Sequence, residues 1–139
     1  MGAVLSQKGK DGIEIVISYA SIRPSKNEIN YCGTRKEILA VLHYIRFFSH
    51  CLLGKSFVIR TDHKSLTCFM SWRNLSTSQY FAWISELSQY DFKIEHRKGN
   101  NHTNADILSR LEHEDSCNLQ CNLQPNIELN INAVSKDCE

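Results

Sequence analysis

The stretch that decides the fold is Ser56-Phe57-Val58-Ile59-Arg60-Thr61, followed at once by Asp62-His63-Lys64. Its apolar run is continuous rather than alternating, which predicts a strand covered on both faces, inside a sheet. Asp62 then stands where this strand ends. Because ligands of α/β sheets bind beyond the ends of strands, Asp62 is a candidate site residue.

The elements around this strand predict a mixed α/β domain. Isoleucines alternate with other residues over 13–19, and a tight turn at Asp11-Gly12 joins this strand to the apolar run 3–5. Helical spacing follows a capping-box pattern twice. The further expected elements are a helix over 34–48, the strand 56–61, a helix over 76–87, a strand over 92–97 and a helix over 103–111.

Composition indicates one globular domain in 139 residues, with 42% hydrophobic and 22% charged residues. No apolar run reaches the roughly 20 residues that span a bilayer. The N-terminal residues lack the basic and apolar regions of a secretory signal. Without such a signal, we expect the six cysteines to be free thiols in a reducing compartment.

The net charge of +1 hides an asymmetry along the chain. Residues 1–110 hold 15 of the 16 Lys and Arg and 9 of the 15 Asp and Glu, which leaves +6 (15 minus 9). Residues 111–139 hold the remaining one Lys and six Asp and Glu, which leaves −5 (1 minus 6). A basic body suggests an anionic partner such as nucleic acid, and an ordinary solvated surface is an equal alternative on charge alone.

Three acids stand where expected elements begin or end: Glu37, Asp62 and Asp106. If they meet at one edge of the sheet, their oxygens favour Mg²⁺ or Mn²⁺ as the compensating cation. A local alternative exists, because Glu37 lies three residues after Thr34 and has the position of a capping-box acid. Asp106 has a similar explanation in the first turn of the last helix.

Four motifs around these acids occur in a fixed order. They are Gly2-Ala3-Val4-Leu5-Ser6-Gln7, Tyr31-Cys32-Gly33-Thr34-Arg35-Lys36-Glu37-Ile38-Leu39-Ala40-Val41, Thr61-Asp62-His63-Lys64-Ser65-Leu66 and Gly99-Asn100-Asn101-His102-Thr103-Asn104-Ala105-Asp106-Ile107-Leu108-Ser109-Arg110. This succession resembles the ribonuclease H domain of Ty3/gypsy-type retrotransposon reverse transcriptases, part of a Pol polyprotein. The resemblance covers about residues 2–111 and implies an RNase H-like mixed sheet with flanking helices.

The resemblance also implies a chemistry: two-metal hydrolysis of the RNA strand of an RNA–DNA hybrid, with Mg²⁺ or Mn²⁺. Glu37, Asp62 and Asp106 match three of the family's four carboxylates, which are catalytic and bind the metals. The residues expected to contact nucleic acid are His63, Lys64, Arg97 and Lys98, and His102 is an auxiliary candidate. The implied partners are the hybrid and the upstream polymerase domain of the same polyprotein, with no membrane, at an intracellular location in a cytoplasmic particle or the nucleus.

The chain departs from the family at its start. The family's first carboxylate is an Asp on a strand just upstream of the Gly-Ala-Val-Leu-Ser-Gln motif, and here only Met1 precedes Gly2. In the family that strand is central, between the strands matching 2–7 and 57–61. We therefore expect an N-terminally truncated domain that lacks its central strand and is catalytically impaired. The alternative is a non-catalytic remnant of a retroelement that binds RNA or hybrids.

The composition changes after residue 112. Cys117-Asn118-Leu119-Gln120 repeats as Cys121-Asn122-Leu123-Gln124, and asparagine-rich sequence follows. We expect an RNase H-like domain over 1–112 and a low-complexity, disordered acidic tail over 113–139, whose deletion would leave thermal stability nearly unchanged. A zinc site is a further alternative, with the ligands His113, Cys117, Cys121 and Cys138.

Overall fold

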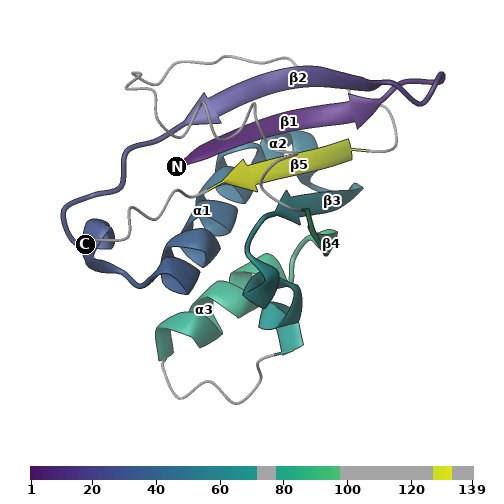
Figure 1. Cartoon of the computed structure of the whole chain (residues 1–139). Helices are drawn as coiled ribbons and strands as arrows, with labels where there is room; N and C mark the ends of the chain where they lie inside the picture. The colour runs from purple at the N-terminus through teal and green to yellow at the C-terminus, as the bar shows by residue number, and fades with distance from the viewer. Residues whose placement is uncertain (72–77, 98–126, 133–139) are drawn as a thin grey trace.

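The computed structural model describes residues 1–71, 78–97 and 127–132, with the backbone alone at 69–71 and 132 (Figure 1). The strands are β1 (Gly2–Lys8), β2 (Glu14–Ser21), β3 (Ser56–Thr61), β4 (Asp91–His96) and β5 (Ile127–Asn132). The helices are α1 (Gly33–Phe47), α2 (Ser49–Leu52) and α3 (Ser78–Leu87), with 3-10 segments η1 (Glu28–Asn30) and η2 (Lys64–Ser71). Each expected strand and helix up to residue 97 is present, with bounds shifted by a few residues.

The five strands form one mixed sheet in the order β2-β1-β5-β3-β4 (Figure 1). β1 pairs antiparallel with both β2 and β5, whereas β3 pairs parallel with both β5 and β4. The inner position expected for β3 is confirmed. With its flanking helices, the sheet has the α/β architecture expected of an RNase H-like fold.

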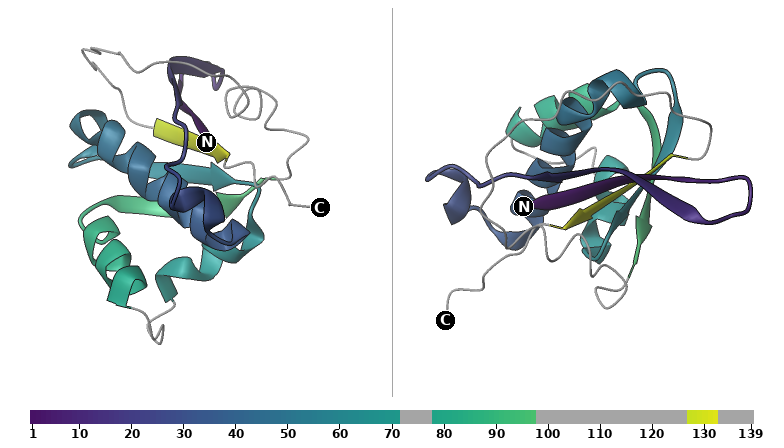
Figure 2. Two further views of the ribbon diagram at one scale, coloured as in Figure 1. Left: turned by 90° about the vertical axis from the view of Figure 1, so that its left-hand side faces the viewer. Right: turned by 90° about the horizontal axis from the view of Figure 1, so that it is seen from above.

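A tight turn joins β1 to β2, as the sequence predicts. Gly12 adopts a φ of 74°, in the left-handed region that favours glycine. The Gly9 amide donates to the Ile13 carbonyl at 2.8 Å, and the Gly12 amide donates to the Gly9 carbonyl at 3.0 Å. Seen from above, this hairpin projects from the body of the molecule (Figure 2).

The core lies between the sheet and helices that cover one of its faces (Figure 2). α1 contributes a buried stripe at helical spacing that includes Ile38, Leu42 and Ile45, each at most 1% exposed. On α3, Trp83 is 8% exposed and packs edge-on against Tyr80, so its expected place in the core is confirmed. Among the described residues, no helix is both long and apolar enough to cross a membrane.

The centre of the sheet is where the structure departs from expectation. β5 lies between β1 and β3, the place at which the sequence predicts a missing strand. Ile127, Leu129 and Ile131 are at most 1% exposed and join the core, because they alternate along the strand toward the helices. The prediction of a disordered tail is therefore wrong for 127–132, and its deletion is no longer expected to be harmless. The rest of 113–139 lies outside the described residues.

Two further expectations concern cysteines and the last helix. Cys51, buried on α2, is disulfide-bonded to a residue that is not described, so the expectation of six free thiols is wrong there. Cys32 and Cys68 are free and exposed. The expected helix over 103–111 and the four candidate zinc ligands lie outside the described residues.

Candidate functional site

One edge of the sheet gathers the sequence-predicted site residues that the structure describes. β3 ends there at Thr61, and Asp62 and His63 follow. The first turn of α1 lies beside them, because Thr34 Oγ1 is 3.1 Å from His63 Nε2. We call the group formed by Glu37, Asp62 and His63 the acid edge.

Glu37 is a buried carboxylate rather than a helix cap. α1 begins at Gly33 with Cys32 as its N-cap residue, and no side chain caps the helix. The capping-box interpretation is therefore wrong: Thr34 contacts His63, and Glu37 is only 4% exposed. Burial lowers the pKa of the Met1 α-ammonium, and the negative charge of Glu37 partly offsets that effect. The structure thus places Glu37 near the start of β1, at the acid edge.

The end of β4 reaches the same edge. His96 Nε2 lies 3.0 Å from the carbonyl oxygen of Asp62, and the Arg97 amide donates to the Thr61 carbonyl at 2.8 Å. The His63 amide donates to Thr61 Oγ1 at 3.1 Å, which holds the chain as it leaves β3. Three predicted nucleic-acid contacts, His63, Lys64 and Arg97, therefore lie close to Asp62. Lys98, His102 and Asp106 lie outside the described residues.

The donor chemistry of the acid edge suits a hard divalent cation. Glu37 and Asp62 offer carboxylate oxygens, the ligands that Mg²⁺ and Mn²⁺ prefer. Within the described parts of the chain, no group of three or more His, Cys, Asp or Glu residues is arranged to hold a metal ion. A third carboxylate, predicted at Asp106, falls outside those parts.

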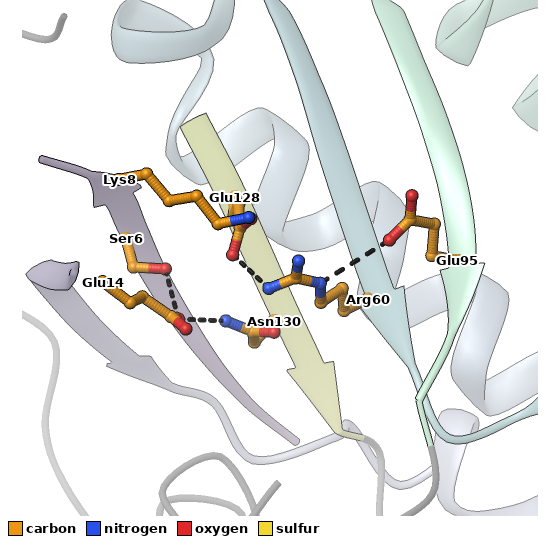
Figure 3. Close-up of polar contacts among 7 residues, drawn as sticks. All are labelled: Ser6, Lys8, Glu14, Arg60, Glu95, Glu128 and Asn130. Carbon is orange, nitrogen blue, oxygen red and sulfur yellow. Dashed lines mark hydrogen bonds and ion pairs between the residues drawn. The ribbon is translucent and has the colours of Figure 1, made fainter. Parts of the chain in front are cut away.

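A second polar group, absent from the sequence-based expectations, covers the opposite face of the sheet from α1 (Figure 3). We call it the outer-face cluster, and its members are Ser6, Lys8, Glu14, Arg60, Glu95, Glu128 and Asn130. These residues come from all five strands. Glu128 and Asn130 are only 4% and 6% exposed, so the centre of this cluster is withdrawn from water.

Arg60 and Glu128 form the centre of the outer-face cluster. Arg60 Nη1 donates to Glu128 Oε2, and Lys8 Nζ lies 3.2 Å from Glu128 Oε1. Arg60 Nε is also 3.7 Å from a carboxylate oxygen of Glu95. Glu128 thus has two cationic neighbours on the strands at either side of β5.

Asn130 and Glu14 form the other half of the outer-face cluster. Glu14 Oε1 accepts hydrogen bonds from Ser6 Oγ at 2.7 Å and from Asn130 Nδ2 at 3.2 Å. Asn130 Oδ1 is buried, and the described residues give it no hydrogen-bond donor. The period of two in Ile-Glu-Leu-Asn-Ile-Asn is the sequence signal that could have identified this strand.

The outer-face cluster is separate from the acid edge. Glu128 pairs in register with Val58, four residues before Asp62, and the rise of a strand puts about 13 Å between those levels. Glu128 is the one carboxylate in the β5 sequence. β5 therefore brings no carboxylate to the acid edge.

Arg35 links α1 to α3 through aromatic rings. Its guanidinium carbon lies 4.1 Å from the ring centroid of Tyr31, 5.8 Å from that of Tyr80 and 5.9 Å from that of Trp83. Cation–π contact of this kind favours arginine, whose flat guanidinium stacks on rings. This contact fixes the first turns of α1, which also carry Thr34 and Glu37.

Comparison with known proteins agrees with the fold. Residues 1–90 match the model of the RNase H-like domain found in reverse transcriptase. The chain is 36% identical over 116 residues to the retrovirus-related Pol polyprotein from transposon 297 of Drosophila melanogaster, covering 84% of this chain and 10% of that polyprotein. It is 35% identical over 112 residues to the enzymatic polyprotein of figwort mosaic virus, covering 78% of this chain and 17% of that protein. It is 33% identical over 117 residues to the transposon Tf2-3 polyprotein of Schizosaccharomyces pombe, covering 82% of this chain and 9% of that protein.

These relatives are much longer proteins, of which the chain spans between about a tenth and a sixth. The matched region includes β1, α1 and β3, the elements that bear or adjoin Glu37 and Asp62. The chain belongs to the RNase H-like domains found in reverse transcriptases.

Proposed function

We propose that this chain binds RNA–DNA hybrids at the acid edge and that, as it stands, it hydrolyses them slowly or not at all. The observation that carries this proposal is the identity of the central strand. The strand between β1 and β3 is β5, whose one carboxylate, Glu128, is ion-paired with Arg60. The family's chemistry requires a carboxylate from the central strand at the edge that Glu37 and Asp62 occupy.

Binding is supported by the cations beside the acids. Lys64 is exposed at the start of η2, and Arg97 follows β4 at the same edge. Contacts from such residues to phosphate need no particular base sequence and depend on charge, which is why they suit a hybrid of any sequence. His63, whose ring contacts Thr34, follows Asp62 directly at this edge.

For the metal, Glu37 and Asp62 would be ligands, with Asp106 as the third acid. Two divalent ions would activate a water molecule and stabilise the leaving oxygen of the cleaved phosphodiester. The protein's own contribution is to hold two carboxylates on neighbouring elements, with Glu37 buried and the backbone around Asp62 tied to His96 and Thr61. Losing one ligand lowers stabilisation of the transition state more than it lowers binding.

A second candidate is a remnant that binds RNA or hybrids without any turnover. It is favoured by the ion pair between Arg60 and Glu128, because that pair engages the one carboxylate of β5 in a structural contact. In either case we propose that the natural context is a Pol polyprotein inside the cell, with a polymerase domain upstream.

The test compares two proteins: this chain, and the same chain extended upstream by the family's Asp-bearing strand. Both are incubated with Mg²⁺ and an RNA–DNA hybrid labelled on its RNA strand, and binding is measured in parallel in Ca²⁺. We expect both proteins to bind the hybrid and only the extended one to cleave it. A control variant of the extended chain, Asp62→Asn, should bind and not cleave.

Three results discriminate among the proposals. Binding without cleavage by both proteins favours the non-catalytic remnant. Equal and robust cleavage by the unextended chain contradicts impairment. Failure of both to bind the hybrid at low salt contradicts the proposed function as a whole.

A further inference from the structure

β5 belongs to the sheet in an unusual way. Both of its ladders join strands that are remote in sequence, β1 near the start of the chain and β3 in the middle. Twenty-nine residues, 98–126, separate it from Arg97, the last described residue before it. The position of β5 in the sheet is therefore set by its contacts with β1 and β3 rather than by a short turn. Those contacts determine which strand sequences fit this position.

Backbone pairing supplies most of the recognition. Residues 127–132 pair with Gly2–Gln7, and residues 127–130 pair with Phe57–Arg60 on the other side. We call the space between these two edges the central slot. A strand in the central slot satisfies two rows of backbone groups that would otherwise be buried without partners, which is costly.

Side chains make the central slot selective for one pattern. Toward the helices it takes apolar side chains at alternate positions, where Ile127, Leu129 and Ile131 lie. On the outer face it presents Arg60 and Lys8 to the position between the first two of these, where Glu128 lies. An occupant with a neutral or basic residue there would leave the Arg60 guanidinium largely buried and without its principal carboxylate. Burying an unpaired charge costs free energy, so such an occupant would bind less tightly.

We propose that the central slot is a strand-binding site that also accepts, from a separate polypeptide, an extended acidic segment with this pattern. The segment has apolar residues at alternate positions and a carboxylate between the first two. β-Strand addition of this kind takes affinity from the main chain and specificity from alternate side chains. This inference concerns peptide binding and does not depend on nuclease activity.

β5 is an imperfect occupant, which makes exchange feasible. Asn130 Oδ1 is buried, and the described residues give it no hydrogen-bond donor. Burying this oxygen without a partner costs free energy, and a strand with an apolar residue at this position would avoid that cost. Covalent attachment keeps β5 at a high local concentration. A competing segment therefore enters when that attachment is cut or when β5 itself is weakened.

The experiment uses the full chain with Leu129→Asp, which places a charge in the core and weakens the chain's own β5. A fluorescent peptide with the sequence of residues 125–134 is titrated into this variant. Reducing conditions are used so that the disulfide of Cys51 does not contribute to the result. We expect saturable binding and a rise in the melting temperature of the variant with peptide concentration. The same peptide with Glu128→Gln keeps the shape and loses the charge, and it should bind about tenfold more weakly.

A second arm needs no destabilised protein. A protease site is inserted at a position within residues 113–124 of the wild-type chain, so that the connection to β5 can be cut after folding. Under the same reducing conditions, so that no disulfide of Cys51 joins the pieces, we expect the two pieces to stay together and the labelled peptide to exchange into the cut protein. The proposal is overturned if neither protein takes up the peptide, if the Glu128→Gln peptide binds equally well, or if the cut protein instead forms dimers that exclude it.

Discussion

Arg60 and Glu128, 68 residues apart in the chain, form an ion pair that joins β3 to β5 across the outer face of the sheet (Figure 3). The side chain of Glu128 is 6% exposed and that of Arg60 is 16% exposed. The pair is therefore shielded from solvent far more than an ordinary surface pair. It gives the central strand a charged contact in addition to its apolar face.

Removing this charge should destabilise the fold. In Glu128→Gln, the one carboxylate that the described residues leave beside Arg60 is the more distant Glu95, and we expect the free energy of unfolding to fall by about 2 kcal/mol. Urea denaturation followed by circular dichroism measures this change. The double variant Arg60→Met with Glu128→Leu, which removes both charges, should recover most of the loss. A single variant as stable as the wild type would show that the ion pair contributes nothing.

The apolar face of β5 should matter more. Leu129 is fully buried, and Leu129→Ala should cost about 2–5 kcal/mol through lost burial and the cavity left behind. Leu53→Ala is the matched control, because Leu53 is 64% exposed and its loss should change stability by less than about 0.5 kcal/mol. Equal melting temperatures for the two variants would mean that β5 does not occupy the centre of the sheet in solution.

The contrast between β3 and β5 shows how far sequence reasoning reaches here. β3 has a continuous apolar run, which identifies an inner strand without knowledge of its neighbours. β5 has the sequence Ile-Glu-Leu-Asn-Ile-Asn, half of it polar and within an asparagine-rich stretch. Composition favoured disorder there, and only long-range pairing with β1 and β3 makes those polar residues acceptable in a central strand.

The site residues remain predictions, although the structure brings the elements that carry them to one edge. Glu37, Asp62, His63 and Lys64 come from the motifs, whereas Arg97 was chosen as a cation that could contact phosphate. The local capping explanation of Glu37 failed because Cys32, two residues before the expected capping residue Thr34, holds the N-cap position. The outer-face cluster could not be foreseen, since its members come from five strands whose order depends on β5.

Nucleic-acid binding should depend on the cations at the acid edge. Lys64→Ala with Arg97→Ala should weaken binding to an RNA–DNA hybrid and reduce the slope of log affinity against log salt by about two, one for each phosphate contact. Fluorescence anisotropy over a range of salt concentrations gives that slope. Lys10→Ala is the control, because Lys10 is exposed at the hairpin turn, at the other end of β1 from the acid edge. If the control reduces the slope as much as the double variant, the hybrid does not bind at this edge in particular.

The aromatic contacts of Arg35 should stabilise the junction of α1 and α3. Arg35→Lys keeps the positive charge and loses the flat guanidinium above Tyr31, so we expect a loss of about 1 kcal/mol. Chemical denaturation measures it. Lys36→Arg, at the neighbouring position, serves as the control and should have little effect. If Arg35→Lys is as stable as the wild type, the stacking of the guanidinium on the rings contributes nothing to stability beyond its positive charge.

Extension of the chain upstream should set two strands in competition for the central slot. The added strand would be followed almost directly by β1, whereas β5 reaches the slot only after the 29 residues 98–126. A shorter connection costs less loop-closure entropy, so the upstream strand should win and β5 should leave the sheet. Hydrogen exchange then reports the outcome: amides of 127–132 should be protected in the unextended chain and exchange rapidly in the extended one. Amides of β4 should be protected equally in both. Continued protection of 127–132 in the extended protein would mean that β5 holds the central slot against the added strand, and any gain in cleavage would then need another source.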